Sequence, residues 1–210
     1  MRTILVANRK GGCGKTLVAV TLAAALAGRQ GGAVALADAD PQKSALRWLK
    51  SRPPVAPAIH ALDWTHAGDV GDAPKRLDWL VIDAPGALAG NRAEALIAEA
   101  DAILTPVLPS GFDADSTRRF LKEIEAVKRV RKGKVAVHLI ANRVRAQGRA
   151  TERLRGFFDR IGQEPLAWIA ERALYADLAD AGLAVFDRPQ RAYAPARAQW
   201  EPVLEALAQP

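Results

Sequence analysis

Short apolar runs alternate with longer segments of helical composition along most of the chain. The apolar runs are continuous rather than alternating with polar residues, which is typical of strands buried on both faces of a sheet. The predicted strands cover residues 3–8, 33–38, 55–62, 79–83, 102–107, 135–141 and 166–169, and the predicted helices cover residues 15–27, 42–50, 92–99, 113–131, 149–161, 174–181 and 197–208.

This order of strands and helices predicts an α/β fold, with a mostly parallel, twisted β-sheet covered by helices on both faces. Pro53 and Pro54 are expected to end the second helix, and residues 52–74 are expected to be irregular. The sequence has no internal repeat and no long linker, so we expect residues 1–210 to form one domain. The first strand begins near residue 3, which leaves no room for an N-terminal helix-turn-helix domain.

The amino-acid composition is that of a globular protein. Half of the 210 residues are hydrophobic and 25% are charged. The apolar runs fall short of the roughly 20 residues that a membrane-spanning helix needs, and the N-terminus lacks a signal-peptide pattern. Cys13 is the one cysteine, so an internal disulfide is excluded. We therefore expect a cytoplasmic protein.

The net charge of +7 is concentrated in one part of the chain. Residues 118–160 contain 14 Lys and Arg against 4 Asp and Glu. Such a basic block suggests a polyanionic partner, such as nucleic acid or a phospholipid surface. A solvated, solubilising face is the alternative.

The strongest motif is the glycine-rich segment 9–16, Arg-Lys-Gly-Gly-Cys-Gly-Lys-Thr, which lies between a predicted strand and a predicted helix. Its glycines allow backbone N–H groups to surround phosphate oxygens, and the helix directs its positive end at the same anion. Lys15 would reach the β- and γ-phosphates of ATP, and the Thr16 hydroxyl would bind Mg²⁺. The predicted nucleotide-binding residues are Lys10, Gly11, Gly12, Cys13, Gly14, Lys15, Thr16 and Leu17.

Arg9 stands where the ordinary phosphate loop has its first glycine, and Lys10 and Gly11 follow it. This arrangement resembles the deviant Walker A motif of the ParA/MinD family, and the chain looks like a short ParA-type partition ATPase over nearly its whole length. The resemblance implies that Lys10 crosses the interface of an ATP-dependent homodimer and contacts the partner's phosphates. It also gives Lys10 and Lys15 a catalytic role, because cations there stabilise charge that develops during phosphoryl transfer. The alternative for Lys10 is a solvated loop lysine.

Two further motifs end in carboxylates. Asp38-Ala39-Asp40-Pro41-Gln42 follows the second strand, and Asp83 ends the strand 79–83. By resemblance, Asp40 is the catalytic residue that positions or activates the attacking water. Asp38 supports the Mg²⁺ shell, and Asp83 holds the ion, through water. An Asp-Pro turn and a helix cap are the alternatives.

Weaker resemblances follow. The segment 105–110, with Asp113 after it, resembles a switch region near the γ-phosphate, although Asp113 fits a helix N-terminal carboxylate equally well. Asn142, placed directly after a predicted strand, matches the position at which relatives hydrogen-bond adenine. Arg172 lies in a segment like the second adenine-side loop, which here lacks the usual proline.

The resemblance also implies non-specific DNA binding by the ATP-bound dimer, through Lys and Arg side chains that contact phosphates. The predicted DNA-binding residues are Arg143, Arg145, Arg149, Arg153, Arg191 and Arg197. Arg145, Arg149 and Arg153 recur at intervals of four, so they would share a helix face if the helix begins early enough. The implied partners are DNA and a ParB-like adaptor that stimulates hydrolysis, and the cargo is a plasmid, a chromosome region or a protein body. The dimer would associate with the nucleoid.

Two other functions remain open. A MinD-like membrane switch needs a basic amphipathic C-terminal helix, whereas residues 199–210 contain two acidic residues and no basic one. An ATP-dependent metabolic synthetase of the same fold would need a substrate pocket for which the sequence has no motif.

Overall fold

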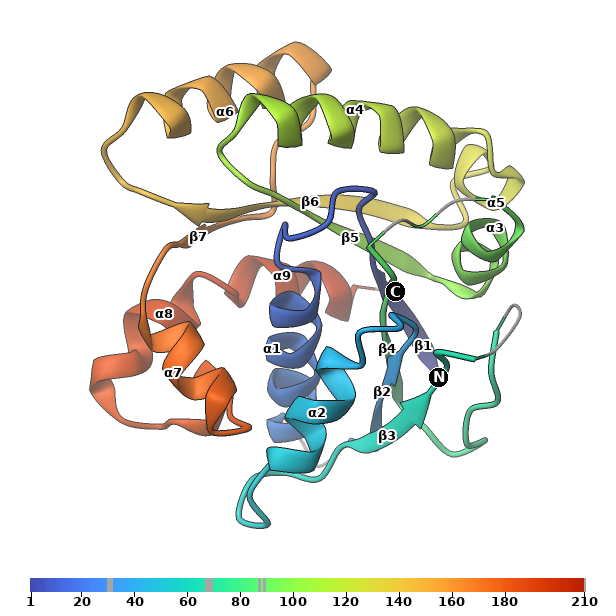
Figure 1. Ribbon diagram of the computed structural model, residues 1–210, viewed down its shortest axis with the longest axis vertical. Coiled ribbons are helices and arrows are strands. Elements are labelled where there is room, and N and C mark those ends of the chain that lie inside the picture. Colours follow the sequence, from blue (N-terminus) through green and yellow to red (C-terminus); the bar gives the residue numbers. More distant parts are fainter. Residues whose placement is uncertain (30–31, 67–69, 87, 89, 210) are drawn as a thin grey trace.

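A computed structural model describes residues 1–29, 32–66, 70–86, 88 and 90–209. Within these residues, seven strands form one sheet in the order β3-β2-β4-β1-β5-β6-β7, and all neighbouring strands are parallel (Figure 1). The strands are β1 (Arg2–Val6), β2 (Val34–Asp38), β3 (His60–Asp63), β4 (Trp79–Asp83), β5 (Ala102–Val107), β6 (Ala136–Val144) and β7 (Ala167–Ala170).

Helices cover both faces of the sheet. They are α1 (Lys15–Gly28), α2 (Ser44–Ser51), α3 (Gly90–Glu99), α4 (Gly111–Glu125), α5 (Lys128–Arg131), α6 (Arg149–Ile161), α7 (Leu174–Asp180), α8 (Ala194–Ala198) and α9 (Glu201–Ala208), with 3₁₀ turns η1 (Val185–Asp187) and η2 (Arg191–Tyr193). The predicted fold class, a mostly parallel α/β sheet with helices on both faces, is therefore confirmed.

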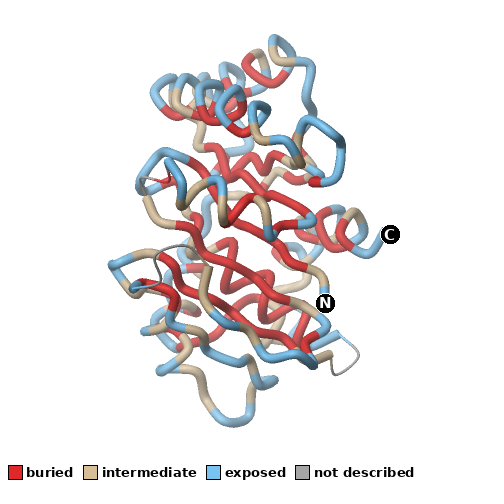
Figure 2. The backbone as a smooth tube through the Cα atoms, turned by 90° about the vertical axis from the view of Figure 1, so that its right-hand side faces the viewer, coloured by how far each residue is buried: buried red, intermediate tan, exposed pale blue. Residues whose placement is uncertain are grey.

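The two layers of helices bury two separate cores. In β1 and the residue after it, Ile4 and Val6 face the core formed with α1, α7 and α9, whereas Leu5 and Ala7 face the core formed with α3, α4 and α6. Adjacent strand residues point to opposite faces, and both faces are dry here, which explains why the strands are continuous apolar runs. Figure 2 shows the result, a buried centre with exposed residues on the outer helices and loops.

Four predicted elements differ from the structure. The strand predicted at 55–62 is the shorter β3, which lies at the sheet edge and is largely exposed. The helix predicted at 113–131 begins at Gly111 and is interrupted at Val127, whose backbone is extended, so it forms α4 and α5. The strand predicted at 135–141 continues to Val144. The helix predicted at 197–208 is split into α8 and α9.

A buried ion pair joins the end of α2 to η1. The Arg52 guanidinium donates to both carboxylate oxygens of Asp187, at 2.8 and 2.7 Å, and the two side chains are only 6% and 2% exposed. Arg52 also lies over the Trp48 ring, 4.9 Å from its centroid. Because a paired guanidinium and carboxylate satisfy each other here, the charges can be buried. This contact holds the C-terminal part of the chain against the helix that follows β2.

Candidate functional site

The glycine-rich loop lies at the carboxyl end of β1, in the middle of the sheet, where parallel α/β sheets bind ligands. Gly14 precedes α1 with a left-handed backbone at φ 93°. A Cβ atom on Gly14 would come within 2.4 Å of Asn142 Nδ2, which donates to the Cys13 carbonyl over 2.9 Å. Only glycine fits there, because the conformation is left-handed and the neighbouring amide is close.

Two lysines belong to this loop and differ in exposure. Lys15 is 6% exposed, and its ammonium donates to the Lys10 carbonyl over 3.2 Å, so it is folded back on the loop. The Lys10 side chain is exposed. The Cys13 thiol donates to the same carbonyl, and burial raises its pKa, which keeps the thiol protonated.

Asn8, which the sequence analysis did not identify as a site residue, anchors the loop. It is fully buried, and its amide nitrogen donates to the Pro106 carbonyl and the Thr117 hydroxyl at 2.9 and 3.0 Å. Its side-chain oxygen accepts from the Lys10 N–H at 3.3 Å. The sequence signal for Asn8 is a polar residue that ends an apolar run immediately before the glycine-rich segment 9–16.

Asp38 and Asp40 shape the turn after β2. The carboxylate of Asp38, fully buried, accepts from the backbone N–H groups of Asp40 and Leu46, both at 3.0 Å. Asp40 in turn accepts from the N–H groups of Gln42 and Gly86, at 2.9 and 3.0 Å. The last bond links the turn after β2 to the loop after β4, so both motifs meet at one place.

Asp83 ends β4 and is fully buried, yet neither carboxylate oxygen has a hydrogen-bond partner among the described residues. Burial, with a smaller contribution from Asp38, raises the pKa of Asp83 to about 7, while the Thr16 hydroxyl and Lys15 oppose the rise. An unpartnered buried carboxylate beside a second carboxylate is unfavourable unless a cation is bound there.

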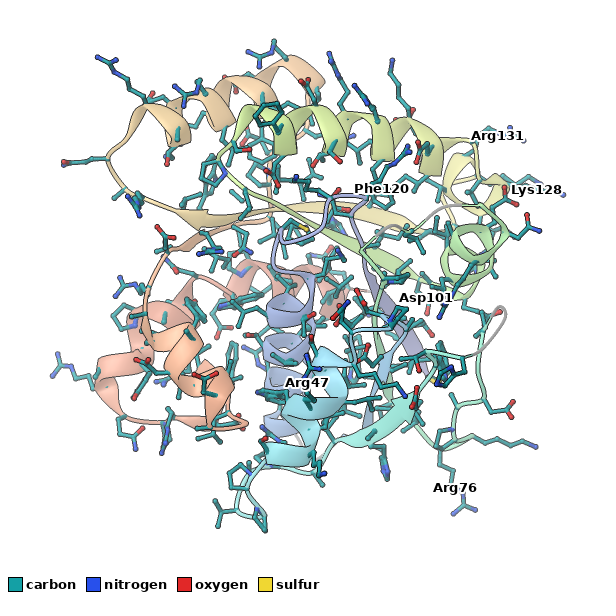
Figure 3. All side chains as sticks on the ribbon, in the orientation of Figure 1. Arg47, Arg76, Asp101, Phe120, Lys128 and Arg131 are labelled. Carbon is teal, nitrogen blue, oxygen red and sulfur yellow. The ribbon has the colours of Figure 1, made fainter. Side chains whose placement is uncertain are left out.

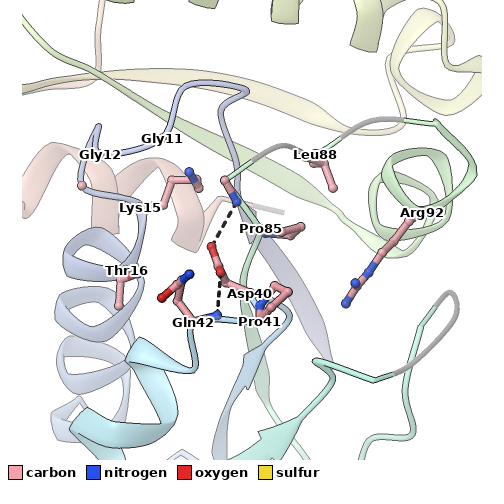
Figure 4. Close-up of a pocket in the computed structure, with 12 residues that line it drawn as sticks. Gly11, Gly12, Lys15, Thr16, Asp40, Pro41, Gln42, Pro85, Leu88 and Arg92 are labelled. Atoms are coloured by element: carbon pink, nitrogen blue, oxygen red, sulfur yellow. Dashed lines mark hydrogen bonds between the residues drawn. The ribbon is translucent and has the colours of Figure 1, made fainter.

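The glycine-rich loop, the turn that carries Asp40 and the loop after β4 surround a cleft of about 680 Å³ (Figure 4). The glycines of the loop and the first residues of α1 form one wall, and the segments 40–42 and 85–86 form the other. The lining residues are Gly11, Gly12, Gly14, Lys15, Thr16, Asp40, Pro41, Gln42, Pro85, Gly86, Leu88 and Arg92. The cleft thus combines uncapped N–H groups at the N-terminus of α1, a lysine and the Asp40 carboxylate, which suits a polyphosphate with a divalent cation.

The residues present fit Mg²⁺ held jointly with phosphates. Within the described part of the chain, no cluster of three His, Cys, Asp or Glu residues could hold a metal ion by itself. Mg²⁺ commonly keeps several waters and takes its other ligands from one or two side chains and substrate phosphates. The Thr16 hydroxyl and the unpartnered Asp83 carboxylate supply such side chains, and Asp38 lies close enough to Asp83 to affect its pKa.

The other residues predicted to bind the nucleotide, Asn142, Leu17 and Arg172, do not line this cleft. Asn142 is inside β6 rather than after it, because the strand continues through Arg143, whose backbone is left-handed at φ 53°. The Asn142 side chain donates to the Cys13 carbonyl in the loop. Leu17 is half-buried on α1, and Arg172 is exposed after β7. Asp113 is 4% exposed and accepts from the Ser110 hydroxyl at 2.7 Å, at the start of α4.

The basic residues predicted to bind DNA do not share one surface. Arg145 precedes α6 rather than belonging to it, so the expected face of three arginines is reduced to Arg149 and Arg153, both exposed. Arg143 and Arg145 both pair with Glu171, at 3.3 and 2.6 Å. Arg191 and Arg197 lie in η2 and α8, on the other face of the sheet from α6. The Arg197 guanidinium donates to the carbonyls of Arg188, Pro189 and Gln190.

The buried Asp83 predicts a pH dependence of stability. Its pKa is about 7 in the fold and near 3.8 in an unfolded chain, so between these values the folded state holds a proton that the unfolded state has released. The free energy of unfolding is therefore expected to fall as pH rises from about 4 to 7. Urea titrations in EDTA at pH 5 and pH 7.5 would measure this. Asp83→Asn should remove much of the difference in unfolding free energy between the two pH values. The same difference in both proteins would contradict the prediction.

Comparison with known proteins identifies the family. A family model described as the CobQ/CobB/MinD/ParA nucleotide binding domain matches residues 4–185. The maintenance of carboxysome distribution protein A of Halothiobacillus neapolitanus is 30% identical over 189 residues, which cover 88% of this chain and 86% of that protein. The chromosome-partitioning ATPase Soj of Thermus thermophilus is 30% identical over 159 residues, which cover 61% and 63%.

A solved structure shares the fold of this chain. The structure of a Cyanothece McdA variant in complex with ATP superposes with a TM-score of 0.78 at 20% identity, and covers 100% of this chain and 97% of that one. The match of the family model to residues 4–185 and the relative that spans most of both chains agree with the deviant phosphate loop at residues 10–16. The chain belongs to the ParA/MinD family of nucleotide-binding proteins.

Proposed function

We propose that this protein is a ParA-type positioning ATPase, a single domain that binds ATP with Mg²⁺, dimerises, binds DNA without sequence preference and is reset by hydrolysis. The observation that carries the proposal is the convergence of the glycine-rich loop, Thr16 and Asp40 on one cleft, with the buried Asp83 close enough to Thr16, Lys15 and Asp38 for them to affect its pKa. Main-chain N–H groups of residues 11–16 bind the phosphates, and Lys15 turns from the Lys10 carbonyl to the β- and γ-phosphates.

Lys10 makes dimerisation depend on ATP. Its side chain is exposed beside the cleft, and among the described residues it forms no ion pair. A second copy that brings its own Lys10 to the phosphates binds only when the γ-phosphate provides enough negative charge. Dimerisation therefore follows nucleotide state, and hydrolysis weakens the contact.

Asp40 positions the attacking water. Its carboxylate is fixed by the N–H groups of Gln42 and Gly86 and lies in the wall of the cleft opposite Lys15 (Figure 4). Mg²⁺, when bound, neutralises charge on the phosphates. Thr16 and Asp83 would hold the ion, Asp83 through water, and Asp38 would support its shell.

DNA binding is assigned to exposed arginines of the basic block, with Arg149 and Arg153 on α6 as the first candidates. Arg143, Arg145, Arg191 and Arg197 stay predictions, and three of them already have partners within the fold. On α5, Lys128 and Arg131 are further candidates, and their side chains project away from the domain (Figure 3). The basic block at residues 118–160 suggests a polyanionic partner, and a ParA-type ATPase would bind DNA through its phosphates. The two interpretations support one another, since both require non-specific phosphate contacts.

A membrane switch is less well supported than DNA binding. Within the described residues, no helix is long and apolar enough to cross a membrane. The apolar side chains of α9, Val203, Leu204 and Leu207, are buried in the core with α1. A helix whose apolar face is already packed cannot present that face to lipid without leaving the fold.

Retention on random-sequence DNA tests the proposal. In 100 mM salt we expect retention with ATP and Mg²⁺, and little retention with ADP or without nucleotide, because the dimer doubles the number of phosphate contacts. Retention should fall steeply with salt, and replacing Arg149 and Arg153 with alanine should reduce the slope by about one per residue removed. Equal retention in all three nucleotide states would reject the proposal.

The cargo and the adaptor are proposed by analogy. The relative with matching length is named for carboxysome distribution, whereas Soj is named for chromosome partitioning. A protein body is therefore the first candidate cargo, and a ParB-like adaptor is the expected stimulator. Association with the nucleoid follows from DNA binding in the ATP state.

A further inference from the structure

Arg92, on the first turns of α3, reaches the turn that carries Asp40. Its guanidinium donates through Nη2 to two backbone carbonyls, those of Ala39 at 3.0 Å and Trp64 at 2.8 Å. Ala39 immediately precedes Asp40, and Trp64 immediately follows β3. Figure 4 shows the side chain extending from α3 toward the 40–41 turn along the wall of the cleft.

The other bonds of the Asp40 turn come from its own sequence neighbours and from the loop after β4. Asp38 accepts from the Asp40 N–H, and Asp40 accepts from the Gln42 and Gly86 N–H groups. The bonds within residues 38–42 fix the local shape of the turn, and the bonds from Gly86 to Asp40 and from Ala39 to the Asp83 carbonyl hold it against β4 and the loop that follows. Arg92 adds a cross-link from α3, so the turn is held on that side as well.

The chemistry of the contact is that of a backbone clamp rather than an ion pair. Among the described residues, no carboxylate pairs with Arg92, and its Nε is buried without a partner. One nitrogen of its planar guanidinium therefore holds two buried carbonyls at once. A side chain used only to fill space would not need a charged donor at this place.

We propose that Arg92 is a positioning residue for ATP hydrolysis, which holds the Asp40 turn so that the carboxylate meets the attacking water. The inference rests on the proposed role of Asp40. Displacement of a reacting group by about 1 Å can reduce a rate by roughly two orders of magnitude, so a clamp one residue away has a large effect on the rate. ATP binding depends on the glycine-rich loop, and among the described residues the hydrogen bonds of Arg92 go to Ala39 and Trp64 on the opposite wall of the cleft.

The test is a comparison of full-length variants in single-turnover hydrolysis and in ATP binding. Arg92→Met keeps the length of the side chain and removes its donors. We expect a decrease of about 10- to 100-fold in the hydrolysis rate with ATP affinity within about threefold of wild type. Arg92→Lys, which keeps a donor, should recover the rate to within about fivefold. Arg76→Met is the matched control, because Arg76 is exposed and projects away from the domain (Figure 3).

The outcomes separate the inference from the proposed function. An unchanged rate in Arg92→Met would overturn the inference. So would a joint loss of rate, ATP affinity and melting temperature that Arg92→Lys does not rescue, since that pattern indicates a structural role. Asp40→Ala is measured in parallel. Wild-type hydrolysis in Asp40→Ala would reject the proposed water-positioning step itself, whereas loss in Asp40→Ala with no change in Arg92→Met rejects the inference alone.

Discussion

Lys15→Ala is expected to reduce ATP affinity by about 100-fold or more. The substitution removes an ammonium group that makes charge-assisted bonds to the β- and γ-phosphates, and each such bond contributes about 1.5–3 kcal/mol. Among the described residues the ammonium donates one hydrogen bond, to the Lys10 carbonyl, so it is available to turn toward a ligand. Titration with a fluorescent ATP analogue in Mg²⁺ would measure the loss.

A folded control makes this result interpretable. Lys75 is an exposed lysine outside the cleft, and Lys75→Ala should bind ATP like wild type. Lys15→Ala should still unfold cooperatively, because its side chain makes a single hydrogen bond within the described part of the chain. Affinity within about threefold of wild type in a folded Lys15→Ala protein would refute the assignment of the loop.

Arg52→Ala is expected to lower the free energy of unfolding by about 3–5 kcal/mol, because it leaves the Asp187 carboxylate buried without its partner. The variant also loses hydrogen bonds to the carbonyls of Pro57 and Gly182 and the contact with the Trp48 ring. Urea unfolding followed by tryptophan fluorescence and by circular dichroism would measure the change.

The exposed pair of Arg29 and Glu201 is the comparison for Arg52. These side chains are 45% and 42% exposed, so Arg29→Ala should cost only about 0–1 kcal/mol. If Arg52→Ala also costs less than about 1 kcal/mol, the Arg52–Asp187 contact does not hold the C-terminal part of the fold as described.

The fold class was predictable because both faces of the sheet are buried. The continuous apolar runs at β2 and β4, and Pro53 after α2, are local signals that tertiary packing does not override. The interruption of α4 at Val127 has no proline or glycine to signal it. The edge strand β3 was placed imprecisely because its residues are mostly exposed and carry little apolar pattern.

The site was predictable where one short motif supplies several groups. Residues 10–16, Asp40 and Asp83 were identified in this way, and they lie around or beside one cleft. Asn8 and Arg92 were missed because their partners are distant in the sequence, at Pro106 and Thr117 for Asn8 and at Ala39 and Trp64 for Arg92. Asn142 was taken to follow its strand because a polar residue usually ends an apolar run.

A crystal structure of Asp40→Ala grown with ATP and Mg²⁺ tests the central claim most directly. The account predicts a triphosphate surrounded by the main-chain N–H groups of residues 11–16, with Lys15 at the β- and γ-phosphates and Mg²⁺ between Thr16 and Asp83. A second copy should place its Lys10 at the same phosphates. Nucleotide bound elsewhere, or a loop left empty at saturating ATP, would contradict the account.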